Sequence, residues 1–316
     1  MLPIVLVCLF VACNSDAKEG SAAQRGSSAA ATSAGRTSTG FSGTAAYDYA
    51  KTQVAFGPRV PGTSAAKQAG DWIIRQMRAR ADTVIVQSFT HTTADGKRLP
   101  LRNTLARFRP ELTERVLYVT HWDSRPVSES ATTEAEKKMP VPGANDGASG
   151  VGLFVALGDV LKKTKPNVGV DLLFTDGEDY GQFGPPEVDV LIGSKYFAEH
   201  PPSPGYKPLY GVLWDMIGDK DLRIPYEMNS FQQAPEVVSR VWQTAADMGY
   251  GDIFVQESGG LVVDDHIPLL NSGMRVIDVI DLDYPPHHTP QDTMDKISAK
   301  SLATVGDVAT ALVTRK

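Results

Sequence analysis

Short apolar runs that each lead into polar side chains constrain this chain more than any other feature of its sequence. The run LYVTH ends at His121, LLFT is followed closely by Glu178 and Asp179, and YGVLWD ends at Asp215. Such runs are typical of strands in an open α/β sheet, whose carboxyl ends line one crevice. We therefore expect these four side chains to converge on a single site.

Two further side chains fit the same pattern. Asp146 stands in PGANDGASG, immediately before a predicted helix, and His288 lies in the loop after the run VIDVIDLDY. All six offer carboxylate oxygens or imidazole nitrogens with no cysteine nearby, which is the donor set of a hydrolytic zinc site. Asp123, two residues after His121, could fix that imidazole as a partner outside the metal shell. The sequence therefore predicts a metalloenzyme.

Each of these signals has a plain structural alternative when it is taken alone. Asp146 could cap the helix that follows it, and Glu178 with Asp179 could be a solvated pair in a loop. Asp215 could be a turn residue at a strand end, and His288 could be a hydrogen-bonded loop histidine. Two adjacent carboxylates repel each other unless a cation lies beside them. The occurrence of all these residues next to strand ends in one chain favours the metal site.

The alternation of strand and helix patterns predicts one α/β domain over residues 45–316. Strands separated by helices build a mostly parallel central sheet that is covered by helices on both faces. The apolar fraction of 42% is sufficient for a substantial core. The expected helices are 64–81, 147–163, 231–248 and 301–313, and the expected strands are 83–89, 103–108, 115–121, 169–175 and 275–280.

The N-terminal segment is typical of protein export. Residues 1–12 are almost wholly apolar and too short to span a bilayer, and residues 1–13 end in LFVAC. This resembles a bacterial lipoprotein signal in which Cys13 carries the lipid, and the Ser-, Ala- and Gly-rich residues 14–44 suit a flexible linker. We expect a lipid-anchored protein at the cell envelope or in the periplasm. The alternative is an ordinary signal peptide that is cleaved near Ala12.

Cysteine content and charge narrow the chemistry further. Both cysteines, Cys8 and Cys13, lie in the export segment, so the predicted domain has neither a disulfide nor a thiolate ligand. The net charge of −6 and the lack of a Lys/Arg-rich run argue against nucleic acid as a partner.

The same motifs carry a family resemblance. The order HWD, NDGASG, DGED, LWD and HTPQDT resembles the zinc-dependent aminopeptidase superfamily, which also contains the glutaminyl cyclases. The segment FGPRVPG and the pair Asp264-Asp265 resemble the cyclase branch, whereas peptidases commonly carry Ser in place of Asp264. The chain departs from the cyclases at His287, where they usually have Trp, and at Asp278, where they tend to have His.

The resemblance implies a zinc-exopeptidase-like fold and a set of metal ligands. Asp146, Asp179 and His288 would hold the principal zinc ion. In the peptidases, His121 and Asp215 would complete a second zinc site that is bridged by Asp146. The cyclases need a single zinc ion, so one or two ions are expected.

The resemblance also implies the catalytic groups. Glu178 would be the general acid/base, and in the cyclases Asp215 and Asp264 would form a hydrogen-bond network around it. The expected function is that of a glutaminyl-peptide cyclotransferase, which converts the N-terminal glutamine of a peptide to pyroglutamate and releases ammonia. A zinc aminopeptidase acting on peptide or protein N-termini is the alternative, and an inactive peptide-binding domain is a third interpretation.

Overall fold

The structure is a computed structural model that describes residues 38–315. The predicted signal segment 1–13, with Cys13, and most of the predicted linker lie outside the described residues. Within the described part of the chain, no helix has the length and apolar character that a membrane span requires.

A mixed six-stranded sheet forms the centre of the fold, in the order β1-β2-β4-β3-β5-β8. These strands are β1 (Thr83–Thr92), β2 (Arg98–Phe108), β4 (Gly169–Thr175), β3 (Arg115–His121), β5 (Tyr210–Asp215) and β8 (Val276–Ile280). The last four are parallel, whereas the β1–β2 hairpin at one edge is antiparallel. The predicted mostly parallel sheet is therefore confirmed for the four strands that lead into the site. A separate pair, β6 (Ile224–Tyr226) and β7 (Phe254–Ser258), forms a small second sheet.

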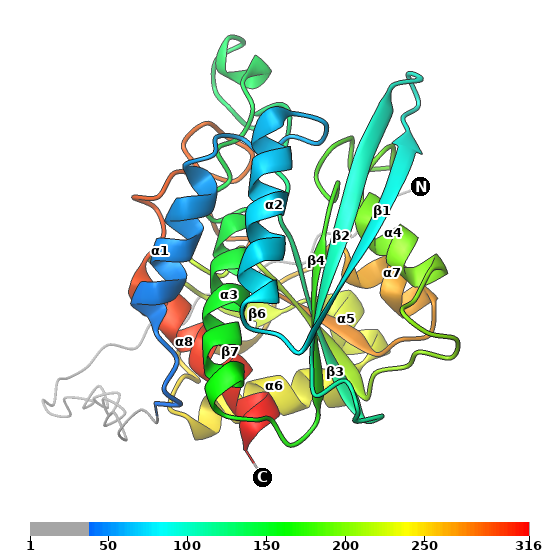
Figure 1. Cartoon of the computed structure of the whole chain (residues 1–316). Helices are drawn as coiled ribbons and strands as arrows, with labels where there is room; N and C mark the ends of the chain where they lie inside the picture. The colour runs from blue at the N-terminus through cyan, green and yellow to red at the C-terminus, as the bar shows by residue number, and fades with distance from the viewer. Residues whose placement is uncertain (1–37, 316) are drawn as a thin grey trace, which may run out of the picture. The chain divides into compact units, whose positions relative to one another are not determined.

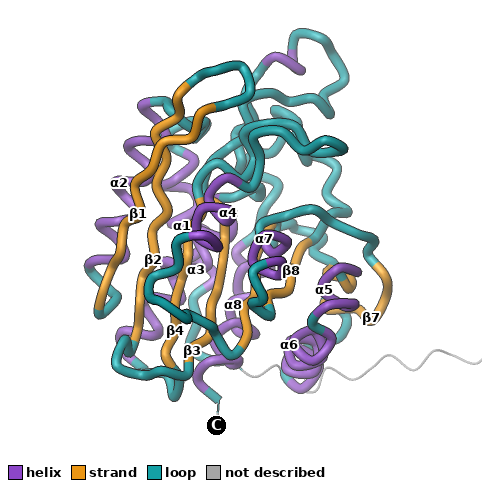
Figure 2. The backbone as a smooth tube through the Cα atoms, turned by 90° about the vertical axis from the view of Figure 1, so that its right-hand side faces the viewer, coloured by secondary structure: helices purple, strands orange, loops and turns teal. Residues whose placement is uncertain are grey.

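Helices cover both faces of the sheet, as the sequence predicts (Figure 1). One face carries α1 (Gly43–Val54), α2 (Ser64–Arg78), α3 (Ala148–Lys163) and α8 (Ala299–Thr314), and the other carries α4 (Ile192–Glu199) and α7 (His266–Asn271). The remaining helices are α5 (Met228–Gln233), α6 (Pro235–Asp247) and the short 3-10 turn η1 (Glu136–Lys138). Figure 2 shows α4 and α7 lying in front of the strands in the view turned by 90°.

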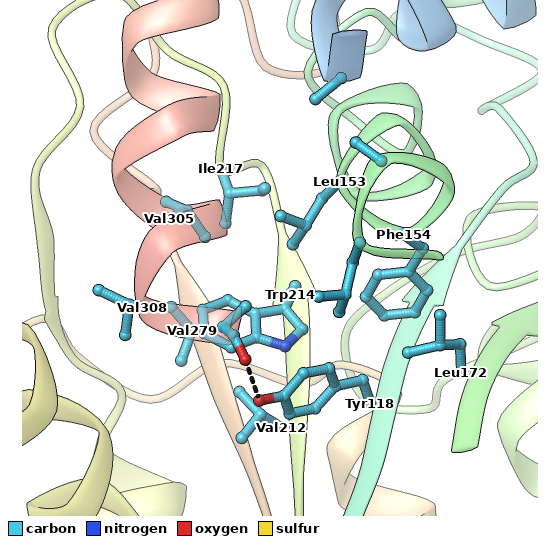
Figure 3. Packing of buried hydrophobic residues seen from close by; sticks show 14 of the residues in the cluster. Tyr118, Leu153, Phe154, Leu172, Val212, Trp214, Ile217, Val279, Val305 and Val308 are labelled. Atoms are coloured by element: carbon cyan, nitrogen blue, oxygen red, sulfur yellow. Dashed lines mark hydrogen bonds between the residues drawn. The ribbon is translucent and has the colours of Figure 1, made fainter. Parts of the chain in front are cut away.

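The alternation of side chains along each central strand explains the two layers. In β3, Tyr118 packs into the larger core with α3 and α8, while its neighbours Leu117 and Val119 pack into the smaller core on the opposite face. Tyr118 stacks edge-on against Trp214 at 5.5 Å, and its hydroxyl donates to the carbonyl of Ala309 at 2.8 Å (Figure 3). These strands are buried on both faces, which is why their sequences are continuous apolar runs.

Two boundaries differ from the sequence-based expectation. The helix predicted over residues 231–248 is confirmed for α6, but its start is wrong, because the chain breaks between α5 and α6 at Ala234, where φ is −139°. Pro235 causes the break, since it lacks an N–H and disfavours a helical conformation in the preceding residue. At the N-terminal side, α1 begins at Gly43 with Ser42 as its cap, so ordered structure starts inside the segment expected as linker.

The parallel strands end together along one edge of the sheet. His121 is paired with Thr175 across β3 and β4, and Asp215 is paired with Ile280 across β5 and β8. The loops that follow these four strands therefore leave the sheet side by side, and this geometry positions the site.

Candidate metal and catalytic site

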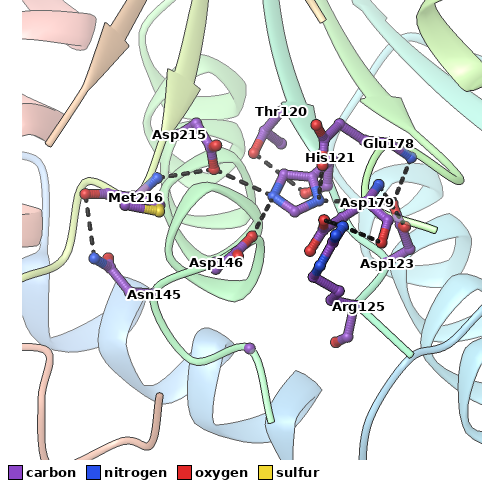
Figure 4. Close-up of polar contacts among 12 residues, drawn as sticks. Thr120, His121, Asp123, Arg125, Asn145, Asp146, Glu178, Asp179, Asp215 and Met216 are labelled. Carbon is purple, nitrogen blue, oxygen red and sulfur yellow. Dashed lines mark hydrogen bonds and ion pairs between the residues drawn. The ribbon is translucent and has the colours of Figure 1, made fainter. Parts of the chain in front are cut away.

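His121 lies at the centre of the polar cluster, fully buried at the end of β3. Its Nε2 atom is 3.0 Å from Asp146 Oδ1 and 3.2 Å from Asp215 Oδ1 (Figure 4). Asp215 Oδ1 also accepts the N–H of Met216 at 2.8 Å. Asp215 therefore also stabilises the turn at the strand end, which was the structural alternative for this residue. The structure thus brings together the three residues that were expected to form a second metal site.

The three residues expected to hold the principal metal ion also meet. His288 Nε2 lies 3.5 Å from Asp179 Oδ1 and 3.7 Å from Asp146 Oδ2. The neighbouring His287 has its Nε2 atom 4.0 Å from the same oxygen of Asp146, so it offers an alternative nitrogen. Asp146 faces both histidine groups with different oxygens, which is the arrangement of a bridging carboxylate.

The spacing of these donor atoms fits a metal ion. Two ligands about 2.0–2.2 Å from a tetrahedral zinc lie roughly 3.3–3.6 Å apart, close to the separations around Asp146 and Asp179. The Oδ2 atom of Asp179 is buried and has no hydrogen-bond partner in the structure, which is costly for a carboxylate unless a cation binds there. The donor set contains only nitrogen and oxygen atoms, which is one of the ligand sets found in catalytic zinc sites.

The electrostatics of the metal cluster follow from burial and mutual charge. Burial acts to raise the pKa of the Asp146 carboxyl, but the hydrogen bond and charge of His121 outweigh it and hold the pKa well below its usual value. Burial and the charge of Asp146 raise the pKa of Asp179 to about 7. For His121, burial lowers the imidazole pKa, yet the surrounding carboxylates, above all Asp215, raise it well above the usual value. The site therefore carries excess negative charge, which a divalent cation would neutralise.

Glu178 lies beside this cluster, and its side chain forms an ion pair with His121 rather than with His288, the histidine predicted to bind the principal zinc ion. Its Oε2 atom is 3.6 Å from His121 Nδ1, and the side chain is buried. Burial raises the pKa of Glu178 well above its usual value, and the charges of Asp264 and Asp179 raise it further while His121 opposes them. A buried carboxyl with a raised pKa is suited to accept and return a proton near neutral pH. The alternative of a solvated Glu178–Asp179 pair is wrong, because both side chains are buried.

Asp123 holds Glu178 and Asp179 in place through their backbone. Its two carboxylate oxygens accept the N–H groups of Glu178 and Asp179 at 3.1 and 3.2 Å. Its separation from His121 Nδ1 is 3.6 Å, which is longer than a hydrogen bond but within the distance of an ion pair. Asp123 is therefore an ion-pair partner of the imidazole, as expected, and it also holds the turn after β4.

Asp264 lies in the same cavity, buried at the loop that precedes α7. Burial raises the pKa of Asp264 well above its usual value, and the charges of Asp215 and Asp265 add to the effect. Its neighbour Asp265 accepts a hydrogen bond from the hydroxyl of Thr175 at the end of β4. Closely packed carboxyls cannot all ionise, so the raised pKa values of Glu178 and Asp264 favour a proton held between these two groups.

Three residues that sequence reasoning left without a role hold the loop that carries Asp146. Asp292 accepts the N–H groups of Asn145 at 2.9 Å and Asp146 at 3.2 Å, and it accepts the hydroxyl of Tyr284 at 2.6 Å. Arg59, fully buried, donates its guanidinium hydrogens to the carbonyls of Pro142 and Gly143. Arg59 is the one charged residue in the Gly- and Pro-rich segment FGPRVPG, and this position could have indicated that its side chain holds a loop.

Two further residues from the long loop after β3 support the other ligands. Glu129 Oε1 lies 2.8 Å from His288 Nδ1, which leaves Nε2 directed at Asp146 and Asp179. Arg125 donates to Asp179 Oδ1 at 2.6 Å and forms an ion pair with Glu129 at 2.7 Å. The length and polarity of this loop indicated a functional role, but nothing in the sequence identified these two residues.

The helix-cap alternative for Asp146 is wrong. The position that caps α3 is occupied by Gly147, in the left-handed conformation with φ of 88°, and no side chain caps the helix there. The carboxylate of Asp146 points instead toward His121 (Figure 4). The backbone N–H of Asp146 donates to the carboxylate of Asp292 at 3.2 Å.

The polar cluster opens into a cavity of about 660 Å³. The buried residues Asp146, Glu178, Asp179 and Asp215 form its floor, and apolar side chains from the loops after β3, β4, β5, β7 and β8 also line it. A cavity of this size accommodates a small ligand or the end of a peptide.

Comparisons with known proteins agree with this geometry. Residues 103–313 match peptidase family M28. A solved glutaminyl cyclase of Porphyromonas gingivalis is 38% identical with a TM-score of 0.83, and the match covers 86% of this chain and 97% of that chain. A solved zinc-dependent exopeptidase of Parabacteroides distasonis is 34% identical with a TM-score of 0.82, and the match covers 87% and 99% of the two chains.

Among curated proteins, the aminopeptidase YwaD of Bacillus subtilis is 24% identical over 272 residues, which is 80% of this chain. The chain spans 51% of the length of that relative, and between 37% and 39% of the next two. The likeness thus includes both of the activities that the sequence motifs left open.

Proposed function

The chain belongs to peptidase family M28, and on that premise we propose that it is a zinc-dependent glutaminyl-peptide cyclotransferase. Enzyme status and zinc follow from the family, from its zinc-dependent relatives and from the donor groups around Asp146. The proposed reaction converts the N-terminal glutamine of a peptide to pyroglutamate with release of ammonia. The aminopeptidase YwaD and the exopeptidase neighbour support hydrolysis of N-terminal residues as the second candidate.

Buried Asp264 is the observation that carries the proposal. It lies in the cavity with Glu178 and Asp215. The resemblance of the Asp264-Asp265 pair to the cyclase branch, where peptidases commonly carry Ser in place of Asp264, favours cyclisation. Burial raises the pKa of Asp264, and the negative charge of Asp264 in turn raises the pKa of Glu178. A shared proton suits a reaction that must carry a proton from an amine to a leaving group.

Zinc, when bound, acts as a Lewis acid on the carbonyl oxygen of the glutamine side-chain amide. We propose Asp146, Asp179 and His288 as the residues that hold it, with Glu129 orienting His288. His121, Asp146 and Asp215 would hold a second ion, which the peptidase interpretation requires.

Glu178 moves the proton in the proposed cyclisation. It accepts a proton from the α-amino group of the substrate as that nitrogen bonds to the amide carbon. It then returns the proton to the amide nitrogen, which departs as ammonia when the carbon–nitrogen bond breaks. The amine and the amide belong to one residue, so holding them together in the cavity contributes further through proximity. In hydrolysis, Glu178 would instead take the proton of an attacking water molecule.

Product analysis on a peptide that begins with glutamine tests the proposal. Cyclisation releases ammonia and keeps every residue in the peptide, whereas hydrolysis releases a free amino acid. We expect pyroglutamate, and we expect Asp264→Ser to abolish most of its formation while zinc stays bound. Release of N-terminal amino acids without pyroglutamate, at a rate that Asp264→Ser preserves, would assign the chain to the aminopeptidases.

We also propose that the enzyme is exported and anchored through a lipid on Cys13. The support is the sequence alone, in which an apolar segment of suitable length ends in LFVAC. Such an anchor would place the cavity where peptide and protein N-termini outside the cytoplasm reach it, at the end of a linker with a root-mean-square span of roughly 30 Å.

A further inference from the structure

Exposed apolar side chains gather around the mouth of the catalytic cavity. Among the described residues, seven large apolar side chains are exposed, and four of these line this cavity. The four, which we name the apolar rim, are Val127, Leu261, Val263 and Leu282, with exposed fractions of 42%, 69%, 42% and 40%. Apolar groups gathered in this way on a surface mark a contact site for a partner or ligand.

The apolar rim continues a buried apolar wall of the cavity. Met216 and Ile280 pack with Tyr284 in a small cluster that is separate from the two main cores, and Val262 packs against it. Met216 and Ile280, which are buried, and Val262, which is half-buried, line the same cavity as the exposed Leu261, Val263 and Leu282. Apolar side chains therefore line the cavity from its buried end to its exposed edge.

Backbone hydrogen bonds hold the rim segment that carries Leu261 and Val263. The N–H of Val262 donates to Glu227 Oε1 at 3.0 Å, and the carbonyl of Val262 accepts from Asn229 Nδ2 at 2.8 Å. The carbonyl of Gly260 accepts the N–H of Met228 at 2.8 Å. Glu227 is itself buried and caps α5. The fold thus fixes two exposed apolar side chains beside the site, and it does so with a buried carboxylate.

Arg125 is the one Lys or Arg side chain among the residues that line the cavity, and it is already paired. Arg125 forms ion pairs with Asp179 at 2.6 Å and with Glu129 at 2.7 Å, and its guanidinium lies 5.6 Å from the ring centre of Phe183. An acidic substrate side chain would therefore find no free cation among the residues that line the cavity. An apolar side chain would instead meet Phe183 and the apolar rim, which line the same cavity.

We propose that the apolar rim binds the side chain of the second substrate residue and gives the enzyme a preference for bulky apolar residues there. The inference rests on the proposed function only in placing the N-terminal residue of a peptide at Glu178, on the cavity floor. An extended chain advances about 3.3–3.6 Å per residue, so the residue after the first lies nearer the exposed edge of the cavity, which the apolar rim lines.

The test measures binding separately from turnover. Dissociation constants are determined for zinc-loaded Glu178→Gln protein with three peptide amides, Gln-Leu-Gly, Gln-Gly-Gly and Gln-Glu-Gly. We expect Gln-Leu-Gly to bind roughly tenfold more tightly than Gln-Gly-Gly, because burial of a leucine side chain contributes that much even when it is incomplete. Gln-Glu-Gly should bind more weakly than both.

Substitutions in the rim then assign the preference to these residues. Adding Leu261→Ser and Val263→Ser should bring the ratio for leucine over glycine close to one. Leu209→Ser is the matched control, because Leu209 is 51% exposed and lies outside the lining of the cavity. It should leave the ratio unchanged.

Equal affinities for the leucine and glycine peptides, or a ratio that survives both rim substitutions, would overturn the inference. A dimer that the rim substitutions dissociate, with no effect on the ratio, would assign the rim to self-association and overturn it as well. Failure of the proposed function is seen separately, as a lack of pyroglutamate from Gln-Gly-Gly with the wild-type enzyme, and it leaves the binding comparison intact.

Discussion

Gly147 separates the candidate ligand Asp146 from helix α3, and its replacement by alanine tests the geometry around His121. Gly147 has φ of +88°, in the left-handed region that favours glycine. A Cβ atom built at this position would lie 2.8 Å from His121 Cε1 and 3.0 Å from both ring nitrogens. His121 is fully buried between Asp146 and Asp215, so the ring has no free space into which it could withdraw.

The expected effect of Gly147→Ala has two parts. A non-glycine residue in the left-handed conformation costs about 1–2 kcal/mol, which should lower the melting temperature by a few degrees. Carbon atoms in ordinary contact are about 3.5–4.0 Å apart, so the ring or the Asp146 loop must move by roughly 0.7 Å or more. A displacement approaching 1 Å at a catalytic group can cost about a hundredfold in rate, and we expect kcat/KM to fall by about that factor.

Gly273→Ala is the matched control for backbone strain. Gly273 has φ of +89°, and a Cβ atom there would meet nothing within 4 Å. Steady-state kinetics, thermal melting and zinc content are compared for both variants. We expect similar melting temperatures and a large loss of kcat/KM in Gly147→Ala alone. If Gly147→Ala kept the activity of Gly273→Ala, the packing of His121 against this turn would not matter to catalysis and the reasoning would be refuted.

Four further predictions concern the acid/base group, the metal, pH and the anchor. Glu178→Gln should lower kcat by roughly 10²–10⁴-fold in steady-state assays while metal analysis shows zinc retained; near-normal turnover would rule out its proton-transfer role. His288→Ala should lose zinc on dialysis, and the wild type should hold about one ion per chain as a cyclase or two as an aminopeptidase. Burial raises the pKa of Asp179 and Asp292 to about 7, so the folded zinc-free protein keeps protons that the unfolded chain releases. Its unfolding free energy should therefore fall as pH rises from about 4 to 7, and denaturant titrations that show a rise would contradict this. Cys13→Ser should move the protein from the membrane fraction to the soluble fraction with its activity unchanged.

The sequence located the site because its signal is local. A continuous apolar run marks a strand buried on both faces, and parallel strands place the residues that follow them at one edge. His121, Asp215 and the Glu178–Asp179 pair therefore meet where the pattern predicted, although they are far apart in the chain. Pro235 is also a local signal, and it indicates a break in the helix that was predicted to be continuous over residues 231–248.

The contacts that hold the site residues in place depend on segments distant in sequence. Asp123 lies two residues after His121, yet its carboxylate accepts hydrogen bonds from the turn that carries Glu178 and Asp179. Glu129 reaches His288 across 159 positions of sequence. Such pairings depend on where loops cross after the sheet has formed, and no periodicity in either segment encodes that crossing.

The sequence by itself determined the α/β class, the strands that lead into the site and the kinds of side chain at their ends, because hydrophobic periodicity and strand ends are properties of neighbouring residues. Only the tertiary structure decided that the β1–β2 hairpin runs antiparallel at the sheet edge, that Glu129 orients His288, and that Leu261 and Leu282 share one rim. These features arise from packing between segments distant in sequence, where the position of each backbone depends on the volume and hydrogen bonds of all the others.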